Sequence, residues 1–126
     1  MTTLSLQDPG LLKNLCFIDD RWVGAADGAT QAVRNPATGA LVGSIPDAGV
    51  GETQAAIRAA RQAFPGWKAR TAEERARILR RWFELMLQHQ EDLALLMTSE
   101  QGKPLAEARG EITYAASFIE WFAEEA

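Results

Sequence analysis

The first part of the chain alternates short apolar and polar runs, a pattern typical of strands joined by tight turns. The runs Cys16–Ile18 and Arg21–Val23 flank Asp19-Asp20, which has the length of a two-residue hairpin loop. Aspartate tolerates the left-handed backbone that such a loop requires. The spacing therefore predicts a β-hairpin at this position.

A second hairpin is expected from strands at 31–34 and 41–45. The segment between them, 35–39, reads Asn-Pro-Ala-Thr-Gly. Proline fixes φ at a turn position and glycine supplies a positive φ, so this segment has the chemistry of a turn. Pro46 should end the second strand, because it has no N–H to donate to a ladder.

From residue 51 onward, apolar residues are spaced three and four apart, which predicts helices. The first helix is expected over 52–64, with Gly51 as its N-cap and Pro65 as its stop. Thr71 and Glu74 have the spacing of a capping box, in which each side chain bonds to the backbone N–H of the other residue. A second helix should therefore begin after Thr71.

A break near 89–92 should separate the second helix from a third helix that continues the apolar pattern. Gly102 is a natural helix end, and Pro104 suits the first turn of a new helix. The buried face of the second helix is expected to consist of Leu79, Trp82, Phe83 and Met86.

The last helix, expected over 104–126, has apolar residues on two sides, which predicts burial on two sides. Its acidic final turn lacks a cap and opposes the helix dipole. We therefore expect that the chain is an N-terminal fragment and that it self-associates through the second of the two apolar stripes. The first stripe is Ile112, Ala115, Ala116, Ile119 and Phe122, and the second, called here the aromatic stripe, is Tyr114, Phe118 and Trp121.

Composition narrows the class of protein. The 126 residues suffice for one domain or for a part of a larger one, and an apolar content of 47% argues against disorder. A net charge of −4 gives no support to a nucleic-acid partner. No apolar run is long enough to span a bilayer and the first residues lack a signal-peptide core, so we expect no membrane partner and a cytoplasmic location.

Combinations of residues that are typical of a catalytic site are nearly absent. His89 is the only histidine and is expected at a helix end on the surface, while Cys16, the only cysteine, is expected as a buried structural thiol. Neither a Walker A motif nor a Gly-x-Gly-x-x-Gly motif occurs, so we name no catalytic and no cofactor-binding residue. Four arginines should form a salt-bridged, solvated face with neighbouring glutamates. They are Arg75, Arg77, Arg80 and Arg81.

Five short motifs, taken in order over nearly the whole chain, resemble the N-terminus of the aldehyde dehydrogenase superfamily. The stretch 107–125 is similar to bacterial succinate-semialdehyde dehydrogenases of 4-aminobutyrate degradation. Such chains often carry Asn-Gly at the first hairpin loop, where this one has Asp19-Asp20. The motifs are Phe17-Ile18-x-x-x-Trp22, Asn35-Pro36-Ala37-Thr38-Gly39, Phe64-Pro65-x-Trp67, Thr71-x-x-Glu74-Arg75 and Glu100-Gln101-Gly102-Lys103-Pro104.

The resemblance implies an incomplete α/β fold that corresponds to the start of an NAD(P)-binding domain, which is a three-layer αβα structure in the whole family protein. Residues 1–50 would supply strands and turns, 51–126 would supply helices, and the catalytic domain would be absent. The implied parent is a homo-oligomer that oxidises succinate semialdehyde to succinate with NAD or NADP, through a cysteine nucleophile. Because that cysteine and the phosphate-binding glycines would lie beyond residue 126, the chain by itself should be inactive and bind no cofactor.

The resemblance also implies a monovalent cation site. Its ligands would be the backbone carbonyls of Val33 and Arg34 and the carboxylate of Glu100, a set of oxygen donors that suits a hard cation. The alternative is that Glu100 only faces solvent at a helix end.

Two other functions remain open from the sequence. The same fold could act on another aldehyde. The chain could also be a non-catalytic remnant that serves as an interaction module, with the last helix docked on a partner.

Overall fold

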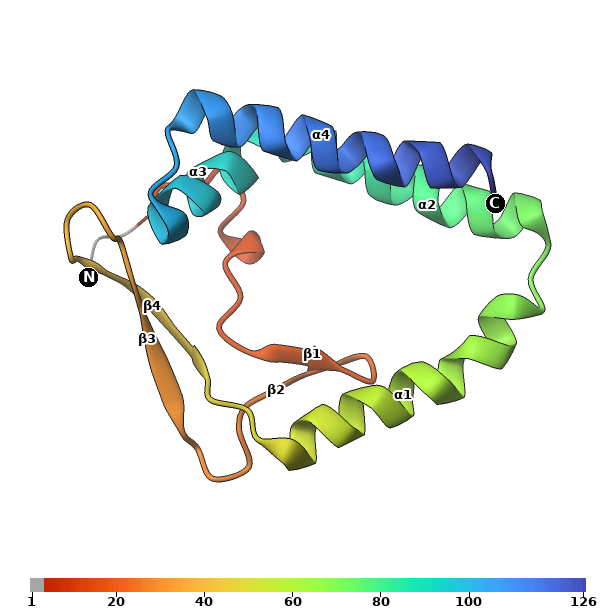
Figure 1. The fold of residues 1–126 in the computed structure, drawn as a ribbon, viewed down its shortest axis with the longest axis horizontal. Helices are drawn as coiled ribbons and strands as arrows, with labels where there is room; N and C mark the ends of the chain where they lie inside the picture. The colour runs from red at the N-terminus through yellow and green to blue at the C-terminus, as the bar shows by residue number, and fades with distance from the viewer. Residues whose placement is uncertain (1–3) are drawn as a thin grey trace.

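The computed structural model describes residues 4–126, and in this range four helices follow two β-hairpins, which confirms the expected incomplete α/β fold (Figure 1). Figure 1 shows α2 and α4 side by side, with α1 and the first hairpin on the opposite side of an open frame. The elements are η1 (Pro9–Leu11), β1 (Cys16–Ile18), β2 (Arg21–Val23), β3 (Thr30–Arg34), β4 (Leu41–Pro46), α1 (Val50–Lys68), α2 (Ala72–Gln88), α3 (Gln90–Gln101) and α4 (Leu105–Glu124).

The first hairpin forms as predicted. Strands β1 and β2 pair antiparallel, with Phe17 opposite Trp22. The two loop residues, Asp19 and Asp20, have φ angles of 52° and 59°. Two successive left-handed residues match the twist of the flanking strands, which explains the tight reversal.

The second hairpin is one residue longer at each outer end than expected, because Thr30 pairs with Pro46. Pro46 is the last residue of β4, so the strand ends there as expected, although Pro46 itself still pairs with Thr30. Both strands of a two-stranded ribbon are edges, and a proline without an N–H is tolerated there. The turn at 35–39 is confirmed, since the Asn35 side chain accepts the N–H of Ala37 at 2.9 Å and Gly39 has φ 70°.

Helix α1 begins before and ends after the predicted limits. Its N-cap is Gly49 rather than Gly51, and it runs through Pro65 to Lys68. Pro65 lies one turn from the helix end, so the hydrogen bond that it cannot donate is lost from a single position. The Pro65 carbonyl still accepts the N–H of Ala69, at 3.0 Å.

Glu52 ties the start of α1 to the loop after β2. Its carboxylate accepts the N–H of Ala26 at 2.8 Å and that of Gly49 at 2.9 Å. The N–H of Glu52 itself, followed by those of Ala26 and Gly49, lowers the pKa of this carboxyl.

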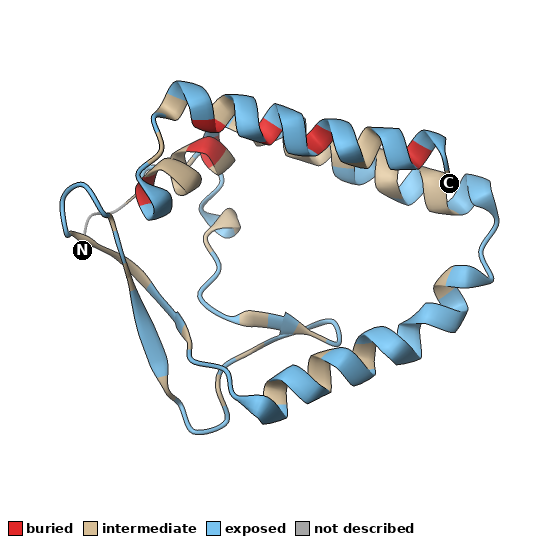
Figure 2. Cartoon of the chain, viewed as in Figure 1, coloured by how far each residue is buried: buried red, intermediate tan, exposed pale blue. Residues whose placement is uncertain are grey.

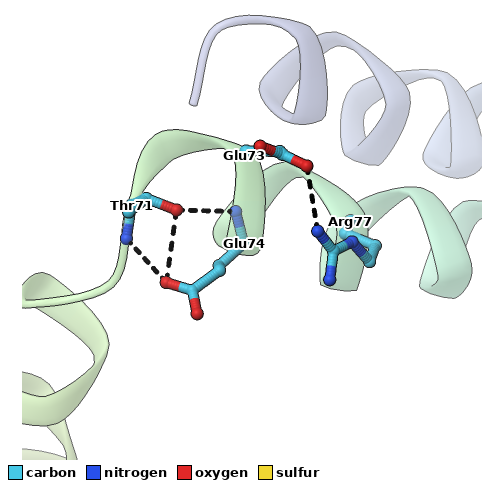
Figure 3. A network of polar contacts seen from close by, with 4 residues as sticks. All are labelled: Thr71, Glu73, Glu74 and Arg77. Atoms are coloured by element: carbon cyan, nitrogen blue, oxygen red, sulfur yellow. Dashed lines mark hydrogen bonds and ion pairs between the residues drawn. The ribbon is translucent and has the colours of Figure 1, made fainter.

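Helix α2 begins with the predicted capping box (Figure 3). The Thr71 hydroxyl accepts the N–H of Glu74 at 3.2 Å, and the Glu74 carboxylate accepts the N–H of Thr71 at 2.9 Å. Hydrogen bonds from Thr71 lower the pKa of Glu74. The predicted break is also confirmed, because His89 caps both the end of α2 and the start of α3.

Helix α4 packs against α2 and α3 through a stripe of mainly small side chains. This stripe differs from the predicted one, since Ala115 and Phe122 are exposed. Packing at steps of four residues favours a narrow face of small residues over the wider stripe that we expected. The buried residues are Ala108, Ile112, Ala116 and Ala123.

Ion pairs border the helix contacts. Arg80 of α2 pairs with Glu120 of α4 at 3.0 Å and also with Glu124. Within α2, Arg77 pairs with Glu73 (Figure 3). The expected salt-bridged face forms in part. Arg77 and Arg81 pair with glutamates of α2, whereas Arg80 reaches across to α4 and Arg75 donates to the Arg70 carbonyl.

Much of the apolar surface is uncovered. Figure 2 shows the buried residues confined to α3 and α4. Trp82, expected in the buried face of α2, is 53% exposed. The accessible surface of 8798 Å² exceeds by about a third the roughly 6,600 Å² expected for a folded monomer of 13.8 kDa. The aromatic stripe is exposed, as expected.

Asp92 of α3 binds the segment that precedes β1 through hydrogen bonds. This side chain is buried, and its carboxylate accepts the N–H of Gln7 at 2.9 Å and that of Asp8 at 2.8 Å. These two hydrogen bonds, the one from Asp8 first, lower the pKa of Asp92. The contact spans more than 80 residues and leaves no local signal in the sequence.

We predict that Asp92→Asn speeds amide exchange at Gln7 and Asp8 at least several-fold, because the amide cannot accept two charge-assisted hydrogen bonds as the carboxylate does. Since the folded-state pKa is lowered, the stabilisation is present above the ordinary carboxyl pKa of about 3.9 and is lost as pH falls through the lower folded-state value. Hydrogen exchange measured by NMR checks both effects. The exposed Asp47→Asn serves as the control, and unchanged exchange in Asp92→Asn would contradict the prediction.

Candidate cation site

The Asn-Pro turn and the end of α3 meet at one corner of the molecule. Gly102, the residue after α3, has φ 81° and ends the helix in a left-handed conformation. A Cβ placed at Gly102 would lie 2.8 Å from Cγ of Pro36. Only glycine therefore fits both the backbone angle and the close approach of the proline ring.

The backbone next to this turn is irregular. Val33 pairs with Gly43 and Arg34 pairs with Leu41, so Val42 is an extra residue in β4. A bulge of this kind interrupts the ladder and turns neighbouring backbone groups away from it. The irregularity falls at the two residues whose carbonyls the family resemblance implies as cation ligands.

The structure brings the strand and helix of the implied site together. Strand β3, which carries Val33 and Arg34, contacts α3, which carries Glu100 in its last turn. Glu100 is exposed. Arg34 is exposed too, and its guanidinium donates to the Gly39 carbonyl at 3.0 Å rather than entering the corner.

The implied donor set suits a hard cation better than a soft transition metal. Within residues 4–126, no group of three His, Cys, Asp or Glu side chains could hold a metal ion. A site here would depend on carbonyl oxygens and one carboxylate, which are hard ligands. In the described range, the buried hydroxyl of Thr98 in α3 has no hydrogen-bond partner. The ligand set Val33, Arg34 and Glu100 stays a prediction.

The two residues considered for catalysis lie in structural positions. Cys16 is half-buried in β1, not fully buried as expected. His89 is half-buried at the junction of α2 and α3. Both positions are explained by the local structure.

Sequence reasoning missed the contact between Pro36 and Gly102. Each residue belongs to a motif that was recognised, but their approach links two segments far apart in the chain. Only the family resemblance, which places ligands beside both motifs, pointed to their proximity.

No helix in the described part of the chain is long and apolar enough to cross a membrane.

The sequence model of the aldehyde dehydrogenase family matches residues 22–126. The chain is 58% identical over 123 residues to glutarate-semialdehyde dehydrogenase of Pseudomonas aeruginosa, covering 98% of this chain and 26% of that protein. It is 58% identical over 122 residues to succinate-semialdehyde dehydrogenase (NADP(+)) of Escherichia coli, covering 97% of this chain and 25% of that protein.

Solved structures agree. An aldehyde dehydrogenase from Brucella melitensis biovar abortus superposes with a TM-score of 0.96 at 58% identity, over 98% of this chain and 26% of that chain. A betaine aldehyde dehydrogenase from Staphylococcus aureus in complex with NAD+ has a TM-score of 0.86 at 29% identity, over 92% of this chain and 24% of that chain.

The fold and the sequence agree on one class of protein, and the chain belongs to the aldehyde dehydrogenase family. It spans about a quarter of the length of the curated relatives that it matches.

We predict that K⁺ or Na⁺ raises the melting temperature of the protein relative to tetramethylammonium at equal ionic strength, and that Glu100→Gln removes this increment. A cation that binds only the folded state stabilises it by mass action. Thermal unfolding followed by circular dichroism measures the effect. Glu107→Gln, an equivalent change at an exposed position of α4, should keep the increment, and equal increments in the two variants would contradict the site.

Proposed function

We propose that the chain is the N-terminal part of an NAD(P)-dependent aldehyde dehydrogenase whose substrate is an aldehyde with a carboxylate at its far end, with succinate semialdehyde as the first choice. The observation that carries the proposal is the identity of 58% to a succinate-semialdehyde dehydrogenase and to a glutarate-semialdehyde dehydrogenase. Both named substrates are short ω-oxo carboxylates. A pathway role in 4-aminobutyrate degradation, a cytoplasmic location and a homo-oligomeric state belong to the same proposal.

Glutarate semialdehyde is the second candidate substrate. It is favoured by the Pseudomonas relative, which matches as well as the succinate-semialdehyde dehydrogenase does. The two substrates differ by one methylene, and one methylene changes specificity by only about 10- to 200-fold in a hydrophobic pocket. The choice therefore depends on residues that hold the far carboxylate.

In this proposal the chain supplies framework rather than reacting groups. Bound nicotinamide would accept the hydride. The residues of this chain would form the corner at which Pro36 packs against Gly102. The implied cation ligands would lie beside that corner. The helices would form one layer of the NAD(P)-binding domain.

We expect the 126-residue chain to show no dehydrogenase activity and no nicotinamide binding, because we assign the nucleophile and the phosphate-binding loop to the rest of the parent. Fluorescence titration with NAD and with NADP checks the expectation. Saturable binding at micromolar affinity would contradict it.

The protein encoded by the complete reading frame should oxidise succinate semialdehyde with a kcat/KM at least tenfold above that for acetaldehyde, since only the former offers a carboxylate to bind. Initial rates of NADH or NADPH formation with succinate semialdehyde, glutarate semialdehyde and acetaldehyde give the comparison. Equal kcat/KM values for the three aldehydes would refute the substrate class, and absence of activity with all three would refute the proposed function.

A further inference from the structure

We propose that two contacts at opposite ends of α3, the one made by Asp92 and the one between Pro36 and Gly102, are energetically coupled. Both belong to one closed cycle of contacts, which runs from Asp92 through the segment 7–14, called here the strap, to the second hairpin and back through Pro36 to Gly102. The proposal goes beyond the proposed function and does not depend on it.

The first link of the cycle joins the strap to the start of α3. The carboxylate of Asp92 accepts the backbone N–H groups of Gln7 and Asp8. Hydrogen bonds to an ionised acceptor are about twice as strong as neutral ones. Asp92 is only 3% exposed, so water has little access to replace either bond. This end of the strap is therefore held firmly by α3.

The strap itself is stiff. Its middle is the 3₁₀ turn η1, which begins at Pro9, a residue with a fixed φ. Oδ1 of Asp8 accepts the N–H of Gly10 at 2.9 Å, and the Asp8 carbonyl accepts the N–H of Leu11 at 3.1 Å. Because these bonds fix the backbone dihedral angles, the strap transmits a displacement of one end to the other end.

The second link joins the strap to the second hairpin. Asn14 lies against β4, since a Cβ placed at Gly43 would be 3.7 Å from Oδ1 of Asn14. Gly43 pairs with Val33 beside the bulge, close to the Asn-Pro turn that contains Pro36. Figure 1 shows the strap running from α3 to β1. The strap therefore contacts the hairpin near the turn that touches α3.

The third link is the packing of the Pro36 ring on Gly102. The Cγ atom of Pro36 occupies the space that a Cβ of Gly102 would need, and Gly102 has φ 81°. A shift of the turn therefore acts directly on the end of α3. The helix closes the cycle, because the backbone from Asp92 to Gly102 is a single helix with its C-cap and spans roughly 15 Å.

A closed cycle of stiff parts couples its links. When one link is formed, it holds in place the segment that the other link needs, so the second link to form has fewer residues to order. Opening either link should therefore weaken the other. Thermodynamic linkage requires that this effect be equal in both directions.

The first experiment uses the protein encoded by the complete reading frame and follows hydrogen exchange by mass spectrometry. Asp92→Asn should speed exchange at Asn35 and Gly39, whose N–H groups close the turn, by about threefold or more. The amides of α2 serve as the internal reference for global unfolding. Glu91→Gln makes the same change one residue earlier and loses a pair with Arg109 outside the cycle, so it should leave the turn unchanged. Unchanged exchange at the turn in Asp92→Asn would overturn the proposal.

The second experiment tests the reverse direction in the same protein. Pro36→Ala removes the packing on α3 without adding a clash and should speed exchange at Gln7 and Asp8 by a similar factor. Gly102→Ala should do the same. The control is Gly28→Ala, because Gly28 has φ 75° but no described atom within 4 Å of its added Cβ. If Gly102→Ala does not fold, Pro36→Ala decides alone, and an unchanged strap in Pro36→Ala overturns the coupling.

The double variant with Asp92→Asn and Pro36→Ala separates coupled links from independent ones. Once the packing of Pro36 is lost, the strap no longer restrains the turn through a closed cycle. The acceleration of exchange at the turn should therefore fall about threefold or more below the product of the two single accelerations. An acceleration equal to that product would mean that the two contacts are independent, which would overturn the proposal.

Discussion

The contact of α4 with α2 and α3 through a narrow stripe of small residues is the constraint on which the helical layer depends. Alanine side chains at Ala108, Ala116 and Ala123 permit close approach but bury few methyl groups. The relative placement of the helices therefore also depends on directional polar contacts at the edges of the stripe. Glu91 accepts a forked pair of hydrogen bonds from Arg109 at 2.8 Å each, which fixes the planar guanidinium in one orientation.

Local rules explain what could be predicted. The left-handed backbone of Asp19 and Asp20, and the reciprocal bonds of Thr71 and Glu74, depend on residues within four positions of one another. The hairpin loop and the capping box can therefore be predicted from the sequence. The same holds for the end of α3 at Gly102, where a positive φ and a following proline act together.

Contacts between distant segments explain what could not be predicted. Pro65 removes one hydrogen bond from α1, yet three more residues remain helical after it, so the residue type alone does not fix where the helix ends. Periodicity placed Trp82 on an apolar face, but the partner that would cover this face is missing among residues 4–126. Pro36 lies against Gly102 near the implied cation ligands, and neither propensity nor spacing encodes that approach. The family resemblance placed implied ligands beside both motifs, but it did not give this contact.

Some surfaces of the molecule are fully packed, whereas others expose large apolar side chains, and the difference has a physical cause. At the corner of Pro36 and Gly102, a ring fills the space that a Cβ would need, so this contact is complete without further residues. Along α1 and α4, large apolar side chains remain in water, which costs free energy in proportion to their area. Helices selected for solvent on both sides would carry polar residues there. The sequence of α1 and α4 is therefore that of helices covered on two faces, whereas the corner of Pro36 and Gly102 is packed without further residues.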